Sequence, residues 1–472
     1  MGKHRPYLEL VDSNVPWLGK VPSHWRVHQL KRAVEGCVNG VWGSEPDGIN
    51  DIAVIRVADF DRIGARVNVD DYTMRSITLN ERRGRLLKSG DLLIEKSGGG
   101  DKQLVGAVVI HEKPLPAVTS NFVARMSPAP GYNPIFLKYV FHYLYSGRVN
   151  YPSIKQATGI QNLDSNQYLS EYFSFPPTEE QNGIASFLDH ETTKIDRLIA
   201  KQERLIELLK EKRQAVISHA VTKGLNPDAP MKNSGVEWLG EVPAHWSVSR
   251  IKHAKSMRKN AFVDGPFGSN LKGEHFIDDG DVYVIESNFA TQGILREGAL
   301  KTISFDHFLT INRSETKGGD IIIAKIGAQF GKASILPSLS KQAVVSGNSL
   351  KLTVAKGIIN NEYLCFVLGY LKERGAMDLI VNATAQPALS LGDMNNLEIP
   401  LPSLDEQKEI LADIHKKLNK IDETIAAATR AIELMTEHRV ALISATVTGK
   451  IDVRGWCKPD MELEKSNKTA TA

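Results

Sequence analysis

The chain has 472 residues, of which 42% are hydrophobic and 24% charged, the balance of a soluble globular protein with room for about three domains. Its formal net charge of +3 excludes a uniformly basic surface, so any nucleic-acid-binding surface must be confined to particular faces or loops. The sequence has no long apolar run, no secretory signal and no paired cysteines, since Cys37, Cys365 and Cys457 are scattered. We therefore expect a cytoplasmic protein with no disulfide framework, zinc site or membrane span.

A tryptophan-bounded segment occurs twice. Residues 17–25 read WLGKVPSHW, and residues 238–246 read WLGEVPAHW. Two tryptophans and a proline beside one histidine are typical of a packed segment. Neither segment places both a nucleophile and a carboxylate beside its histidine, His24 or His245. We therefore assign both segments to the fold and not to catalysis.

Each tryptophan-bounded segment is followed by a body of mixed pattern, and the two bodies share only a skeleton. Residues 90–96 (GDLLIEK) match residues 319–325 (GDIIIAK), a turn followed by branched apolar residues that predicts a buried strand. A glycine-rich loop follows each strand, and the patterns later in both bodies indicate short helices. Each body is therefore predicted to be α+β. A shared frame with different polar loops favours two related binding modules with different targets, because loops usually carry specificity.

A long helix is predicted after each body. One register recurs every seven positions in both helices and is apolar except at Gln202. Ile195 is separated from Ile421 by the same offset as Val216 from Leu442, which indicates a duplicated coiled-coil helix. A run from about residue 188 to 219 would span roughly 48 Å and expose an apolar stripe if it stood alone. One helix of an ordinary bundle is the alternative, but the duplication favours two matched helices packed on each other. The predicted seam comprises Leu188, Ile195, Leu198, Leu205, Leu209 and Val216, then Ile414, Ile421, Met435 and Leu442.

Start and stop signals flank both helices. Thr178 with Gln181, and Ser403 with Glu406, fit capping boxes that follow prolines, and glycines close both segments at 224 and 449. These signals divide the chain into a first body (1–175), a first helix (176–225), a linker with the second body (226–400), a second helix (401–455) and a loose polar tail (456–472).

Two motifs for phosphate or metal chemistry are incomplete. Residues 327–333 resemble a phosphate-binding loop, but the loop is one residue short, and Ala333 stands where a hydroxyl must bind Mg²⁺. Residues 190–194 begin like the zinc-protease motif, but Lys194 occupies the position of the second histidine. We therefore predict neither a phosphate loop nor a zinc site.

A nuclease site and a methyltransferase site are also excluded. Asp91 with Glu95 faintly resembles an acidic nuclease cluster, yet Ala324 replaces the glutamate in the second body. An aspartate after a glycine is more often a turn former. No glycine-rich cofactor loop is paired with an Asn-Pro-Pro-aromatic motif. The sequence therefore predicts no catalytic residue and no metal.

The remaining interpretation is that loop residues of the two bodies bind a ligand. Lysines beside glycines can neutralise phosphates that approach the backbone, and glutamine amides can form bidentate contacts with adenine. Solvated loop residues are the equally common alternative. The candidate DNA-binding residues are Lys96, Lys102, Gln103, Gln161, Lys325, Gln329, Lys332 and Gln386.

The combination of the WLGxVPxHW segments, the glutamate–glutamine pairs at 180–181 and 406–407, and the Ile-Asp text on each helix resembles the specificity subunit of type I restriction–modification systems. The resemblance covers residues 17–451. It implies two target-recognition domains that each read one half of a bipartite, asymmetric DNA site, separated by a long antiparallel two-helix coiled coil. It also implies a subunit that is not catalytic and holds no cofactor.

The resemblance implies partners as well: double-stranded DNA, two methyltransferase subunits that use S-adenosylmethionine, and restriction subunits that use ATP. The two glutamate–glutamine pairs lie in the segment that matches the family's docking site. A DNA-binding regulator that acts alone, and a coiled-coil scaffold, are the alternatives. Salt-dependent DNA binding would exclude the scaffold, and full function without a methyltransferase would favour the regulator.

Overall fold

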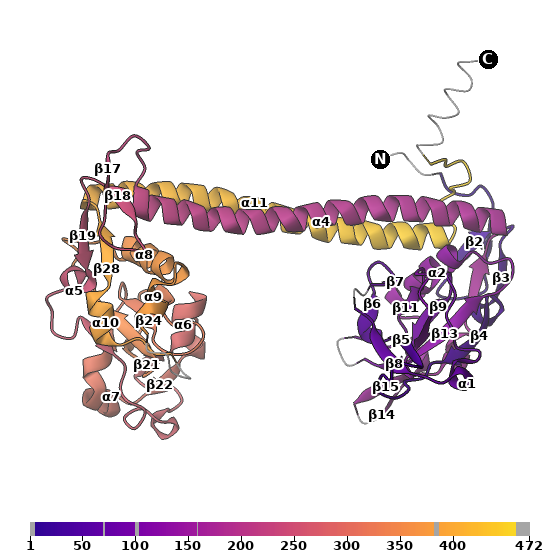
Figure 1. Ribbon diagram of the computed structural model, residues 1–472, viewed down its shortest axis with the longest axis horizontal. Coiled ribbons are helices and arrows are strands. Elements are labelled where there is room, and N and C mark those ends of the chain that lie inside the picture. Colours follow the sequence, from indigo (N-terminus) through magenta and orange to yellow (C-terminus); the bar gives the residue numbers. More distant parts are fainter. Residues whose placement is uncertain (1–4, 69–70, 100–102, 158, 382–386, 459–472) are drawn as a thin grey trace, which may run out of the picture. The chain divides into compact units, whose positions relative to one another are not determined.

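The computed structural model describes residues 5–68, 71–99, 103–157, 159–381 and 387–458 (Figure 1). The chain divides into two compact units. Unit 1 comprises residues 1–203 and 430–472, and unit 2 comprises residues 204–429. Each unit therefore contains one body together with a part of each long helix. Both bodies mix short strands with helices, so the predicted α+β class is confirmed.

Unit 1 is built on a sheet whose central strand, LLIE at 92–95, is fully buried as the sequence predicts. Its strand order is β4 (Val34–Asn39), β13 (Val123–Pro128), β9 (Leu92–Glu95), β11 (Val108–Ile110), β7 (Arg66–Val67) and β6 (Phe60–Asp61). The smaller sheets are β12 (Ala117–Thr119)–β5 (Asp51–Ile55)–β8 (Thr73–Ser76), β10 (Ser97–Gly98)–β15 (Ile160–Leu163)–β14 (Ile154–Ala157), β16 (Tyr172–Phe175)–β3 (Arg26–Gln29) and β1 (Leu10–Asp12)–β2 (Lys20–Pro22). The short helices are α1 (Leu79–Arg82), α2 (Pro134–Ser146) and α3 (Ser165–Tyr168).

Unit 2 repeats this frame with its own strands. The four-stranded sheet β20 (Phe262–Asp264)–β27 (Ser349–Leu352)–β24 (Ile321–Ala324)–β25 (Ala333–Ile335) has the order of β4–β13–β9–β11. The other sheets are β22 (Lys301–Ile303)–β21 (Val282–Ile285)–β26 (Gln342–Val345)–β23 (Glu315–Thr316), β19 (Ser247–Arg250)–β28 (Glu398–Leu401) and β17 (Met231–Asn233)–β18 (Glu241–Pro243). The helices are α5 (Ile251–Ala254), α6 (Ser287–Gln292), α7 (Phe305–Ile311), α8 (Asn361–Glu373), α9 (Ala376–Leu379) and α10 (Leu391–Asn396).

The two long helices are α4 (Thr178–Lys223) and α11 (Leu404–Val447), and they pack antiparallel within each unit. In unit 1 the start of α4 lies against the end of α11, and α2 lies between them and the sheet (Figure 1). In unit 2 the end of α4 lies against the start of α11. Leu188, Ile195, Ile414, Ile421 and Leu442 are buried, as predicted for the seam, and Leu209, Val216 and Met435 are partly buried.

Two residues of the predicted seam, Leu198 and Leu205, do not pack in it. Leu198 and Leu205 are 43% and 38% exposed, because the helix turns the other flank of the heptad toward its partner. The residues that pack on that flank lie four positions after a buried seam residue. Ile199 follows Ile195 in α4, and Leu418 follows Ile414 in α11. Both flanks of α4 carry apolar residues, so the spacing alone did not show which one packs.

The predicted capping boxes also differ. The Thr178 hydroxyl donates to the Gly131 carbonyl. The Gln181 amide donates to the Pro176 carbonyl and accepts from the backbone N–H of Asn133, so no box forms in α4. Ser403 does cap α11, accepting from the Glu406 N–H at 3.2 Å. Thr178, Gln181 and Glu406 hold neighbouring segments instead, and Ser403 alone of the four makes its predicted cap contact.

The ends of both helices are closed by glycines with left-handed backbone, Gly224 (φ 70°) and Gly449 (φ 71°). A Cβ on Gly449 would lie 2.3 Å from Pro22 in the first tryptophan-bounded segment, and one on Gly224 would lie 3.2 Å from Trp246 in the second. Trp456, where the polar tail was expected to begin, instead packs its ring against Phe187 with centroids 5.4 Å apart. In the described residues, no helix is both long enough and apolar enough to cross a membrane.

Candidate nucleic-acid interface

The aspartates that open the central strands are turn formers. Asp91 accepts from the backbone N–H of Lys88 at 2.7 Å and from the Ser127 hydroxyl at 2.6 Å. Asp320 accepts from the N–H of Lys317 at 2.9 Å in the same way. Glu95 lies at the opposite end of β9 from Asp91, so the two carboxylates form no cluster. Within the described residues, no group of three or more histidines, cysteines and carboxylates is placed to hold a metal.

The loops that leave the central strands are anchored by the predicted lysines. Lys96 Nζ donates to Asn39 Oδ1 at 3.0 Å, and Lys325 Nζ lies 3.1 Å from Asp264 Oδ2. Asn39 ends β4 and Asp264 ends β20, so the two contacts are equivalent in the two bodies. Both lysines are half-buried and hold the start of the loop to the neighbouring strand.

Each loop also meets the segment that precedes the long helix. The Leu163 N–H donates to the Lys96 carbonyl at 2.8 Å, and the Leu389 N–H donates to the Lys325 carbonyl at 3.0 Å. The structure thus brings together motifs that lie far apart in the sequence. In each body, the loop after the central strand and the segment that precedes the long helix therefore lie side by side. We call these two segments together the platform.

In unit 1 a buried ion pair supports the platform. Arg62 Nη2 lies 2.8 Å from Glu95 Oε2, and Glu95 is fully buried. Burial raises the pKa of the Glu95 carboxyl, and Arg62 opposes that rise. With the Gln103 amide oxygen turned toward Arg62, it accepts from Nε at 3.0 Å and from Nη1 at 2.8 Å. Gln103 is exposed, and its contacts with Arg62 fix the orientation of its amide.

The remaining candidates lie in different settings. Gln161 is buried, and its amide oxygen accepts from the Val105 N–H at 3.2 Å, so it shapes the loop from inside. Gln329 and Lys332 are exposed on the loop after β24. Lys102 and Gln386 lie outside the described residues.

Sequence reasoning missed the role of the two duplicated glutamates. Glu180 accepts from Trp25 Nε1 at 3.0 Å and contacts His24 Nε2 at 2.8 Å. Glu406 makes the same contacts with Trp246 at 2.8 Å and His245 at 3.0 Å. Both histidines therefore do have a carboxylate partner, although it lies far away in the chain. The Tyr7 hydroxyl also donates to Glu180. These contacts join the tryptophan-bounded segments to the long helices, and their duplication was the available signal.

The chain matches a known protein family and is similar to characterised members of it. The family model described as "Type I restriction modification DNA specificity domain" matches residues 62–208 and 268–434. The chain is 25% identical over 323 residues to the type I restriction enzyme MjaVIII specificity subunit of Methanocaldococcus jannaschii, covering 67% of this chain and 70% of that protein.

Two solved structures share the fold. One is a chain from a study of complex assembly and conformational transition of the type I R-M system, with a TM-score of 0.69, 12% identity, and coverage of 91% of this chain and 99% of that chain. The other is the HsdS subunit from Thermoanaerobacter tengcongensis, with a TM-score of 0.54, 13% identity, and coverage of 91% and 98%.

Proposed function

The chain belongs to the family of type I restriction–modification DNA specificity subunits, a non-catalytic component of these enzymes, and on that premise we propose that its two bodies read the two halves of a bipartite, asymmetric DNA site. The observation that carries this proposal is the shared frame with divergent loops. Each body places the loop after its central strand beside the segment before its long helix, and the polar side chains on that platform differ between the bodies.

Individual residues divide by exposure. Gln329 and Lys332 are free to meet DNA in the second body, and Gln103 is held in place for a base edge in the first. Lys96 and Lys325 act mainly by fixing the loops. Gln161 supports its loop from inside, whereas Lys102 and Gln386 remain candidates on the sequence alone. The two target-recognition domains are proposed to occupy 1–175 and 226–400.

We further propose that the long helices dock two methyltransferase subunits, with restriction subunits completing the complex in the cytoplasm. The supporting observation is apolar surface on α4 that its own partner helix does not cover, at Leu198 in unit 1 and at Leu205 and Leu208 in unit 2. Exposed leucines at helical spacing favour an additional helix as partner. S-adenosylmethionine and ATP are then expected on those partner subunits.

Body exchange tests the reading of DNA. Residues 17–175 are replaced by the equivalent body of a relative, and methylated sites are mapped by sequencing DNA from cells that carry the partner subunits. We expect one half-site to change and the other to persist. A change in both half-sites would exclude two independent readers. Full sequence-specific function without a methyltransferase would favour a regulator that acts alone, and loss of all salt-dependent DNA binding in the intact chain would favour a scaffold.

A further inference from the structure

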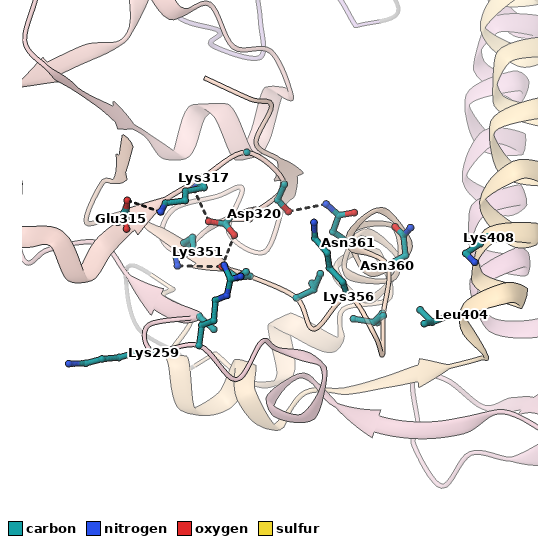
Figure 2. A pocket seen from close by; sticks show the side chains of 17 residues that line it. Lys259, Glu315, Lys317, Asp320, Lys351, Lys356, Asn360, Asn361, Leu404 and Lys408 are labelled. Atoms are coloured by element: carbon teal, nitrogen blue, oxygen red, sulfur yellow. Dashed lines mark hydrogen bonds and ion pairs between the residues drawn. The ribbon is translucent and has the colours of Figure 1, made fainter. Parts of the chain in front are cut away.

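Unit 2 contains a cavity of about 680 Å³ at the start of β24, the opposite end of that strand from the proposed DNA-reading loop. The turn before β24, the strand β27 and the segments that begin α8 and α11 line it (Figure 2). A volume of this size lies in the range of small-molecule sites. The cavity is separate in the fold from the platform of Lys325, Gln329 and Lys332, none of which lines it.

The lining is strongly cationic. It contains two acidic side chains, Glu315 and Asp320, and six basic ones: Arg258, Lys259, Lys317, Lys351, Lys356 and Lys408. Glu315 pairs with Lys317 at 3.2 Å, and Asp320 is held by the turn that it forms. The only ion pair of Lys408 within the described chain is with Asp405, and both side chains are exposed, so it contributes little.

Three of the six cations are left uncompensated. Arg258, Lys259 and Lys356 are exposed at the cavity and form no ion pair with any described residue. Lys351 is buried, and its ammonium donates to the Asn260 carbonyl at 2.7 Å and to the Thr353 hydroxyl at 3.5 Å, which leaves a third N–H donor. Burial lowers the pKa of Lys351, and the nearby Asp320 carboxylate opposes this only in part. Holding such a group in a protein interior is costly unless negative charge compensates for it.

We propose that this cavity binds a small ligand that carries two or more phosphate groups. Several lysine point charges around one concave volume match the charge of a polyphosphate, and the first turns of α8 and α11 add the positive ends of two helix dipoles. A single carboxylate would leave most of these charges unpaired. Lys356 and Asn361 lie on the side of α8 toward Asp320 (Figure 2), and the Asn361 amide donates to the Gly319 carbonyl at 2.9 Å, so a bound anion would contact elements from both sides.

The first body supplies an internal contrast. Asn182 stands at the position of the first long helix that matches Lys408 in the second, and the segment Pro128–Pro130 that precedes α2 carries no charge. Arg125 takes the place of Lys351 in the strand, but its guanidinium donates to the Leu86 carbonyl at 2.7 Å. Lys88 keeps the position of Lys317, but the first body has no lysine at the positions of Lys351, Lys356 and Lys408, so this part of the cationic lining belongs to the second body.

Calorimetric titration of the full-length chain with inorganic tripolyphosphate tests the proposal. The variant Lys259→Ala/Lys356→Ala removes two exposed cations, so the fold should persist and the affinity should fall by about tenfold or more. Lys416→Ala/Lys420→Ala removes the same charge from exposed positions of α11 outside the cavity and should leave the affinity unchanged. Equal binding by the wild type and the cavity variant, or no binding by the wild type, would overturn the proposal.

A duplex containing the recognised site separates this role from DNA binding. The cavity variant should bind the duplex with unchanged affinity and salt slope, whereas Gln329→Ala/Lys332→Ala should weaken duplex binding and leave tripolyphosphate binding intact. If the cavity variant instead lowers the salt slope of duplex binding, the phosphates come from the DNA backbone, and the small-ligand proposal is wrong. Failure of the Gln329/Lys332 variant to affect DNA would count against the proposed reading loop and not against the cavity.

Discussion

Arg439 Nε donates to Asp196 Oδ1 at 2.8 Å and joins α11 to α4 within unit 1. Arg213 and Asp422 form the equivalent pair between the same helices within unit 2. The two arginines are separated by the same offset as the two aspartates, so the ion pair is duplicated with the helices. The repeated Ile-Asp pair therefore has two roles. Its isoleucine fills the helix seam, and its aspartate binds an arginine of the opposite helix.

The two ion pairs should differ in strength because their burial differs. The Arg439 side chain is 5% exposed, whereas that of Arg213 is 41% exposed. We expect Arg439→Ala to lower the free energy of unfolding by about 1–2 kcal/mol, since Asp196 stays partly solvated, and Arg213→Ala by less than about 1 kcal/mol. Denaturant unfolding of these variants, combined with Asp196→Asn and Asp422→Asn in double-mutant cycles, measures both couplings. A larger coupling for the Arg213 pair would contradict this ranking.

The observed packing of the seam leads to a second prediction, which compares a buried and an exposed position of α4. Ile195→Asp should destabilise unit 1 by several kcal/mol, because it buries an unpaired charge at a site that is 6% exposed. Leu198→Asp should change stability by less than about 0.5 kcal/mol, because the carboxylate reaches water. Thermal unfolding monitored by circular dichroism compares the two. Equal losses would show that Leu198 packs after all.

Leu198→Asp has a second use. If the exposed leucines dock a methyltransferase subunit, this variant should fold normally and yet lose co-purification with that subunit. Ala200→Asp, which makes the same change of charge at an exposed residue two positions further along α4, is the control for charge alone. Normal assembly of the Leu198 variant would exclude this part of the docking surface.

The third prediction concerns pH. Burial on α2, with Arg439 and Lys138 nearby, lowers the pKa of His142 from 6.5 to about 4, and Asp61 opposes this only weakly. A depressed pKa means that the unfolded chain takes up the proton more readily, so stability is full above pH 6.5 and is lost as the pH falls toward 4. The loss amounts to at most about 3 kcal/mol. His142→Leu should flatten the pH dependence of the unfolding midpoint in this window, whereas the exposed His253→Leu should not.

The fourth prediction tests the duplicated glutamates. Glu180→Ala leaves Trp25 Nε1 and the Tyr7 hydroxyl without their acceptor, so we expect a loss of about 2 kcal/mol. Burial raises the pKa of the Tyr7 hydroxyl, which therefore stays protonated and needs an acceptor. The exposed neighbour Glu179→Ala should cost less than about 0.5 kcal/mol. Equal stability of the two variants would show that the tryptophan-bounded segment is held by packing alone.

Several features of this protein were determined by the sequence alone, because they depend on contacts between near neighbours in the chain. The buried strands at 92–95 and 321–324, the two long helices, and their first seam position at Ile195 and Ile421 all follow from short-range periodicity. The duplication of the text was sufficient to predict two bodies with one frame, and the combined motifs were sufficient to indicate the family.

Only the tertiary structure decided which partners distant side chains choose. Ile199 and not Leu198 faces the opposite helix, because both flanks of α4 are apolar and only packing against α11 distinguishes them. Glu406 binds His245 and Trp246 instead of completing the predicted capping box with Ser403, since those side chains approach from a segment that is distant in the chain. For the same reason Gln161 lies inside its loop and Lys325 is held by Asp264. A side chain's local sequence fixes its backbone conformation, whereas its hydrogen-bond partner depends on long-range contacts that form only in the folded chain.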